Sequence, residues 1–146
     1  MDDYAIAEKA EGVPDELTAL LREAMPLCAT LRIETDQFDA DQVVMALDWS
    51  EQLTTGGGVL HGGVIMALAD SAGAACASRN LPPGAGTSTI ESKTNFLGAV
   101  RAGRVVATAR PLHVGSSTIV VETEVRAGDR LVAKVTQTQA VLRPRS

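Results

Sequence analysis

One long apolar segment constrains the fold of this chain more than any other feature. From about Leu60 to Ser78 nearly every residue is apolar or small, and Asp70 is the only charge between Val64 and Ala77. A helix that is apolar on all sides is normally buried. We therefore expect this segment to form a central helix, whose many small residues let neighbouring backbone approach closely.

The lone acid in this segment requires a partner or a function, because burying an unpaired carboxylate is costly. On a helix, the side chains that can reach Asp70 lie three and four residues away. Those positions hold Met66, Ala67, Gly73 and Ala74, and none of them can pair with a carboxylate. Two interpretations stay open. Asp70 is either a structural acid bonded to backbone or to a distant arginine, or a group that works with water beside a carbonyl.

The segments around the central helix predict an α+β fold with an antiparallel sheet. Leucine spacing predicts a first helix over about 14–25, with Pro14 in its first turn and an end near Met25-Pro26. Strands are predicted over 31–36, 43–49, 87–97, 103–113, 117–126 and 130–142. Short turns between consecutive strands favour antiparallel pairing, and a sheet wrapped around one helix gives a single domain spanning 1–146. The edges of such a sheet need cover or pairing, which favours a homo-oligomer.

Composition excludes several classes of function. The formal charge of −5 and only four aromatic residues argue against nucleic-acid binding. No apolar run reaches the ~20 residues that span a bilayer, and residues 1–12 lack a signal peptide's apolar core. Cys28 and Cys76 have neither metal-ligand nor CxxC spacing, so we expect reduced thiols in a cytoplasmic protein. The glycines at 56–58 lack the lysine of a phosphate-binding loop and predict a loop without regular structure.

Two motifs carry a family resemblance. The run GGGVLHGGVIMALADSAGAA resembles the HGG…Asp signature of hotdog-fold acyl-CoA thioesterases. The run GTSTIESKTNFLGAVRAG resembles the strand that follows it in the phenylacetate-pathway branch of the 4-hydroxybenzoyl-CoA thioesterase superfamily. The resemblance covers about Leu31 to Leu142. It implies a hotdog fold, an antiparallel sheet wrapped around one long helix, in a homodimer or a dimer of dimers (a homotetramer). It also implies hydrolysis of an acyl-CoA to a free acid and CoA, with no metal and no cofactor beyond the coenzyme A of the substrate.

The resemblance implies roles for four residues. Gly62 matches the glycine whose backbone N–H polarises the thioester carbonyl, which suits the free N–H groups at a helix N-terminus. Asp70 matches the nucleophile or general base, which the family takes from the subunit opposite the one that gives Gly62. His61 matches a positioning residue, and Ser88 matches a serine that orients the water or the carboxylate. Apart from the resemblance, His61 could equally be a helix-start residue and Ser88 an ordinary strand hydroxyl.

Thr55 is a departure from the family pattern. Many relatives carry Asn or Gln six residues before the motif histidine, where it contacts the thioester or the water. A hydroxyl is shorter and forms fewer hydrogen bonds than an amide. Thr55 therefore keeps a second hypothesis open, a hotdog protein that binds acyl-CoA without hydrolysing it. A third, a hydroxyacyl-thioester dehydratase, lacks the proline-rich histidine loop that such enzymes carry.

The phosphates of CoA predict a binding surface near the pocket mouth. The residues expected to approach the nucleotide are Gly63, His113, Gly115, Ser116 and Ser117. The basic candidates are Arg101, Arg104, Lys134 and Arg143, each of which could instead belong to a solvated face.

Overall fold

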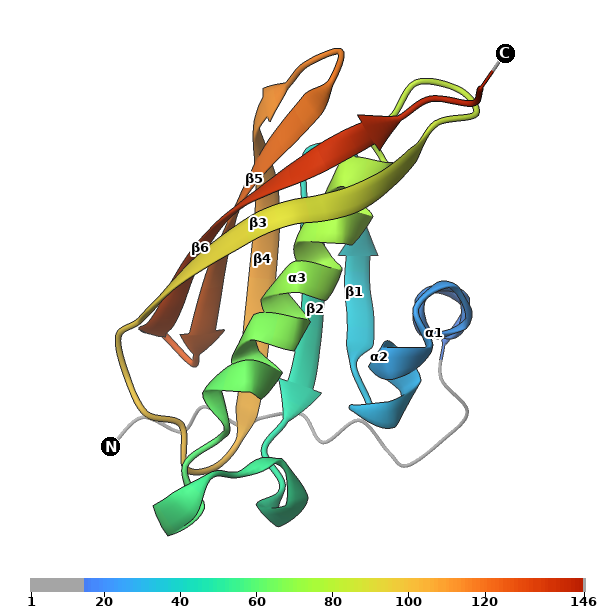
Figure 1. Cartoon of the computed structure of the whole chain (residues 1–146). Helices are drawn as coiled ribbons and strands as arrows, with labels where there is room; N and C mark the ends of the chain where they lie inside the picture. Colours follow the sequence, from blue (N-terminus) through green and yellow to red (C-terminus); the bar gives the residue numbers. More distant parts are fainter. Residues whose placement is uncertain (1–14, 146) are drawn as a thin grey trace.

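A six-stranded antiparallel sheet curves around one long helix (Figure 1), and the predicted α+β fold is confirmed. The computed structural model describes residues 15–145. The helices are α1 (Glu16–Ala24), α2 (Pro26–Thr30) and α3 (Gly62–Ser78), with short 3₁₀ turns η1 (Glu51–Leu53) and η2 (Gly56–Gly58). The strands are β1 (Glu34–Phe38), β2 (Val43–Asp48), β3 (Gly86–Phe96), β4 (Arg104–Val114), β5 (Thr118–Ala127) and β6 (Arg130–Leu142). Their order in the sheet is β1-β2-β4-β5-β6-β3.

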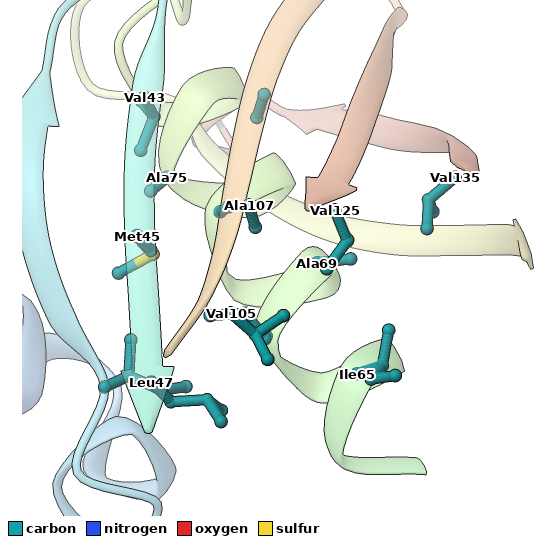
Figure 2. Close-up of a cluster of buried hydrophobic side chains, with 14 of the residues drawn as sticks. Val43, Met45, Leu47, Ile65, Ala69, Ala75, Val105, Ala107, Val125 and Val135 are labelled. Carbon is teal, nitrogen blue, oxygen red and sulfur yellow. The ribbon is translucent and has the colours of Figure 1, made fainter. Parts of the chain in front are cut away.

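The core lies between α3 and the concave face of the sheet. Figure 2 shows Met45 of β2, Val105 of β4 and Val125 of β5 directed toward the helix, where Ala69 and Ala75 face them. All five side chains are 3% exposed or less. The small helix residues let the sheet backbone lie close to α3, as the composition of this segment predicts.

One stripe of α3 stays accessible in the single chain. Gly63 and Met66 are exposed, and Ala67, Asp70 and Ala74 are only partly buried. Spacings of three and four residues place all five on one side of the helix. The prediction that α3 is buried on every side is therefore wrong for a single protomer, and the accessible stripe carries Asp70.

β3 forms one edge of the sheet beside this stripe. Within residues 15–145 it pairs only with β6, with a register shift between Thr89 and Glu91. Three apolar side chains at this edge and just beyond it, Ile90, Phe96 and Leu97, are 60%, 52% and 57% exposed. Unpaired strand edges with apolar side chains are surfaces on which another chain can pair.

The N-terminal region differs most from the sequence predictions. The first helix runs from Glu16 and is capped by the Asp15 side chain, which accepts from the Thr18 N–H. Pro14 and the segment 1–12 lie outside the described residues. Pro26 opens the second helix α2 rather than ending helical structure, since the first helical turn tolerates a missing N–H. The first strand consequently starts at Glu34 instead of residue 31.

The glycine-rich loop before α3 is more regular than predicted. It forms the turns η1 and η2, and a bridge between Thr54 and Leu60 closes it. Gly57 and Gly58 have φ values of 76° and 74°, a region that residues with a Cβ rarely adopt. No helix in the described part of the chain is long and apolar enough to cross a bilayer.

Candidate active site

The start of α3 presents a free backbone donor. His61 is the N-cap, and its Nδ1 accepts from the Gly63 N–H at 2.8 Å. Two backbone hydrogen bonds fix the approach to the helix, from His61 N–H to Leu53 O at 2.8 Å and from Leu60 N–H to Val100 O at 2.7 Å. Within residues 15–145 the Gly62 N–H donates no hydrogen bond. A free N–H at the positive end of a helix suits a developing oxyanion.

Phe96 lies against this donor. A Cβ built on Gly62 would lie 3.1 Å from Cζ of the Phe96 ring, tighter than most real contacts. Phe96 is the last residue of β3, and its ring lies next to the start of α3. The absence of a side chain at Gly62 therefore lets an aromatic ring cover the first turn of α3 beside the free N–H.

Asp70 is held by two uncharged donors from the same chain. Its Oδ1 accepts from Thr89 Oγ1 at 2.7 Å and from Gln137 Nε2 at 3.0 Å. Among the described residues, no cation forms an ion pair with Asp70 and no donor reaches its Oδ2. The alternative in which a distant arginine neutralises this acid is therefore wrong. One carboxylate oxygen is fixed by two hydrogen bonds, and the other accepts none within residues 15–145.

Gly62 and Asp70 are too far apart to act on one carbonyl within a protomer. They are eight residues apart on one continuous helix, which corresponds to a rise of about 12 Å. A nucleophile or base and an oxyanion donor must both lie within about 3 Å of the reacting group. The geometry of a single chain thus separates the two halves of the predicted site.

Sequence reasoning missed the two residues that contact Asp70. Thr89 and Gln137 lie on β3 and β6 and face the helix, whereas Ser88 is exposed and pairs with Ala140 on the outer side. Within one protomer the carboxylate contact thus belongs to Thr89, and the role of Ser88 stays a prediction. The signal was available in the sequence. Gln137 and Gln139 occupy alternate strand positions in phase with buried Val135, where apolar residues are the rule.

Thr55 lies in the loop that leads to the helix start. It precedes η2, is exposed, and donates its backbone N–H to Val59 O at 2.8 Å. Its side chain makes no capping hydrogen bond. The hydroxyl is thus available on the same side of the fold as His61 and Gly62.

The residues predicted to bind CoA lie at two opposite ends of the protomer (Figure 1). Gly63 lies at the start of α3, whereas the turn from His113 to Ser117 joins β4 and β5 at the opposite end of the sheet (Figure 1). In that turn the Gly115 N–H donates to Thr118 O at 2.9 Å. Arg143 donates to Ser116 O at 3.2 Å and so adds a positive charge beside the same turn.

The other basic candidates divide into two groups. Arg104 forms ion pairs with Glu34, Asp36 and Asp48. Lys134 forms ion pairs with Glu122 and Glu124. These contacts support the solvated-face interpretation for Arg104 and Lys134. Arg101 donates to Gly57 O at 2.7 Å and lies beside the loop that leads to His61.

Neither cysteine is suited to nucleophilic chemistry. Cys28 and Cys76 are free and fully buried. Burial raises the pKa of the Cys76 thiol to about 11 and raises the pKa of Cys28 as well. Since the thiolate is the reactive form, Asp70 is the better candidate for attack or proton removal. Within residues 15–145, His, Cys, Asp and Glu side chains form no group of three that could hold a metal ion.

Comparisons with known proteins show the family and the fold of this chain. A family model described as Thioesterase superfamily matches residues 57–134. A 1,4-dihydroxy-2-naphthoyl-CoA hydrolase of Listeria monocytogenes is 34% identical over 101 residues, which cover 69% of this chain and 82% of that protein. A thioesterase structure from Haemophilus influenzae superposes with a TM-score of 0.81 at 28% identity, covering 87% of this chain and 90% of the other. A thioesterase family protein from Silicibacter pomeroyi gives 0.80 at 26% identity, covering 87% and 96%.

Proposed function

The chain belongs to the thioesterase superfamily, which makes it a thioester-hydrolysing enzyme with a hotdog fold, and we propose that it hydrolyses acyl-CoA at a site shared by two copies. The observation that carries the proposal is the arrangement of Asp70. Its Oδ1 is fixed by neutral donors, its Oδ2 accepts no hydrogen bond among the described residues, and the residue lies on the accessible stripe of α3. A carboxylate neutralised by arginine would be a structural group, whereas this one has no cation partner within the described chain.

The proposed reaction uses one group from each copy. The Gly62 N–H of one protomer polarises the thioester carbonyl and stabilises the negative charge that develops on its oxygen. Asp70 of the other protomer either attacks the carbonyl carbon, giving a mixed anhydride that water then hydrolyses, or takes a proton from the attacking water. In both routes the C–S bond breaks, CoA leaves as the thiol, and the acid is released.

Three features support a site between two copies. The rise of about 12 Å from Gly62 to Asp70 keeps them apart in one chain. The accessible stripe of α3 and the apolar side chains of the β3 edge are adjacent surfaces that a second copy would cover. In the proposed two-fold arrangement, each copy's helix start lies beside the other copy's acid.

A CoA ester is the best-supported substrate class. The relative from Listeria monocytogenes is named for the hydrolysis of a CoA thioester with an aromatic acyl group. Arg101 beside the glycine loop and Arg143 beside the β4–β5 turn offer positive charge for phosphates. Coenzyme A then enters as part of the substrate, and the residues named above supply the chemistry.

A thiol-release assay on purified protein tests this proposal. The panel should contain short aliphatic, long aliphatic and aryl acyl-CoAs, including 1,4-dihydroxy-2-naphthoyl-CoA. We expect release of free thiol from at least one class, and a fall in kcat of at least about 10³-fold in Asp70→Asn. Near-normal hydrolysis by Asp70→Asn would refute the role of Asp70. Single turnover in ¹⁸O-labelled water tests the nucleophilic route. Label in the Asp70 carboxylate would establish that route, with water attacking the Asp70 side of the anhydride, since general-base catalysis places the label only in the released acid.

A further inference from the structure

Gln137 is a fully buried polar residue that donates a hydrogen bond to Asp70. The residue lies on β6 and is 0% exposed, and its Nε2 donates to Asp70 Oδ1 at 3.0 Å. An ionised carboxylate accepts hydrogen bonds only, so the amide must present its N–H groups to Asp70. The carbonyl half of the same amide, Oε1, is buried without any hydrogen-bond partner in the described structure.

That unpaired carbonyl lowers stability. Leaving a buried polar atom without a partner costs stability, whereas an apolar side chain of similar shape avoids this cost. Nearby Gln139 shows the contrast. Its Oε1 accepts from Thr87 Oγ1 at 3.1 Å and its Nε2 donates to Thr89 Oγ1 at 2.6 Å, so both halves are paired. Stability alone would favour Met or Leu at position 137.

Gly73 is a second residue at this point that is unfavourable for stability, because it lies within α3. Glycine within a helix lowers the stability of the helix relative to alanine. A Cβ on Gly73 would lie 2.1 Å from Gln137 Oε1 and 2.3 Å from its Cδ, so no side chain fits there while the amide stays in place. Gly73 therefore forms a notch in α3, one turn after Asp70, that the Gln137 amide fills.

We propose that Gln137, seated in the Gly73 notch, is a positioning residue that fixes Asp70 Oδ1 and so directs Oδ2 toward the thioester. The inference rests on the proposed role of Asp70 in hydrolysis. It explains why a buried unpaired carbonyl and a helical glycine occur together, since sites that break local rules of stability are characteristically functional. Thr89 donates the second hydrogen bond to Asp70 Oδ1, and Gln139 in turn donates to the Thr89 hydroxyl.

The test is a double-mutant cycle on kcat with Gln137→Met and Asp70→Asn. Methionine is close in length to glutamine but offers no N–H, so the carboxylate loses one of its two fixing bonds. We expect Gln137→Met alone to lower kcat by about 10- to 100-fold, the scale on which misplacing a reacting group acts, with KM changed by less than about twofold. In the Asp70→Asn background, followed by single turnover with excess enzyme, the same substitution should change the rate by less than about twofold.

Thr123→Val is the matched control. Thr123 is also 0% exposed, its Oγ1 is also buried without a partner, and it lies on the neighbouring strand β5. The Thr123→Val substitution removes an unpaired polar atom and leaves both hydrogen bonds to Asp70 in place. We expect kcat to stay within about twofold of wild type. Thermal unfolding of Thr123→Val should give a Tm at or above that of wild type, because it loses only an unpaired buried group. Gln137→Met loses an unpaired atom together with one hydrogen bond to Asp70, so we expect its Tm to stay near that of wild type.

The outcomes separate this inference from the proposed function. Wild-type kcat in Gln137→Met, alongside an inactive Asp70→Asn, would overturn the positioning role while leaving the hydrolase intact. An equal fall in rate from Gln137→Met in both backgrounds, or a fall matched by Thr123→Val, would show a purely structural effect and would also overturn it. Near-normal activity of Asp70→Asn would instead remove the proposed function itself.

Discussion

α3 contacts two very different surfaces of the same sheet. Toward β2, β4 and β5 it meets apolar side chains such as Met45, Val105 and Val125, which are fully buried (Figure 2). Toward β3 and β6 it meets Thr89 and Gln137, which are hydrogen-bonded to its single charge. The first surface holds the helix in place through burial of apolar area. The second surface fixes the direction of a carboxylate through two hydrogen bonds.

This contrast lets one helix pack into the core on one side and present a carboxylate on the other. The apolar side tolerates no charge, and the polar side offers two neutral donors and no cation within the described residues. A cation in that position would stabilise the charge but compete for the same oxygens. Substitutions on the two sides should therefore have different effects. Those on the polar side should lower activity, and those on the apolar side should lower stability.

The largest difference between the effect on activity and the effect on stability is expected for a substitution at the start of α3. Gly62→Pro removes the proposed oxyanion donor while keeping a residue that suits the first helical position. The preceding His61 has φ −61° and ψ 131°, which a following proline accepts. We expect kcat to fall by about 10²- to 10³-fold, the scale of losing one oxyanion donor, with little change in Tm.

Gly62→Ala is the control for that substitution. It keeps the N–H but adds a Cβ at the same 3.1 Å contact with the Phe96 ring. If crowding against Phe96 rather than the N–H were responsible, alanine would lower kcat as much as proline does. We expect alanine to cost no more than a few-fold, and equal losses in the two variants would contradict the oxyanion role.

A substitution on the apolar side should show the converse. Met45→Ala on β2 deletes a 0% exposed side chain and leaves a cavity beneath α3. We expect the free energy of unfolding to fall by about 2–4 kcal/mol, as for other large-to-small core changes. Activity measured well below the Tm should stay within about twofold of wild type. A fall in kcat as large as that of Gln137→Met would mean that the two surfaces do not have separate roles.

Much of the scaffold could be predicted from periodicity. The last four strands start and end within one residue of their predicted limits, because alternation of apolar and polar residues marks both phase and length. The central helix starts at Gly62 rather than near Leu60, since His61 caps it. Pro26 misled the prediction near the N-terminus, because a proline that ends one helix can open the next.

The motif residues and their surroundings were unequally predictable. Asp70 stood out as a lone charge in an apolar segment, and the assignment of the chain as a thioester hydrolase is confirmed. Its partners Thr89 and Gln137 could not be identified from helical spacing, because they come from strands brought beside it by sheet order. A shift of one residue along a strand reverses the side-chain direction, which is why Thr89 rather than neighbouring Ser88 reaches the acid.

The central claim, that one site takes its acid and its N–H donor from different copies, is tested most directly by mixing inactive subunits. Asp70→Asn and Gly62→Pro chains carrying different affinity tags are co-expressed, and the mixed oligomer is purified through both tags. Each parent alone should keep no more than about 1% of the wild-type kcat. A mixed dimer holds one site with both groups intact and should regain about half of the wild-type kcat per dimer. A mixed oligomer as inactive as its parents would contradict the account, because it would place both groups in the site of a single chain.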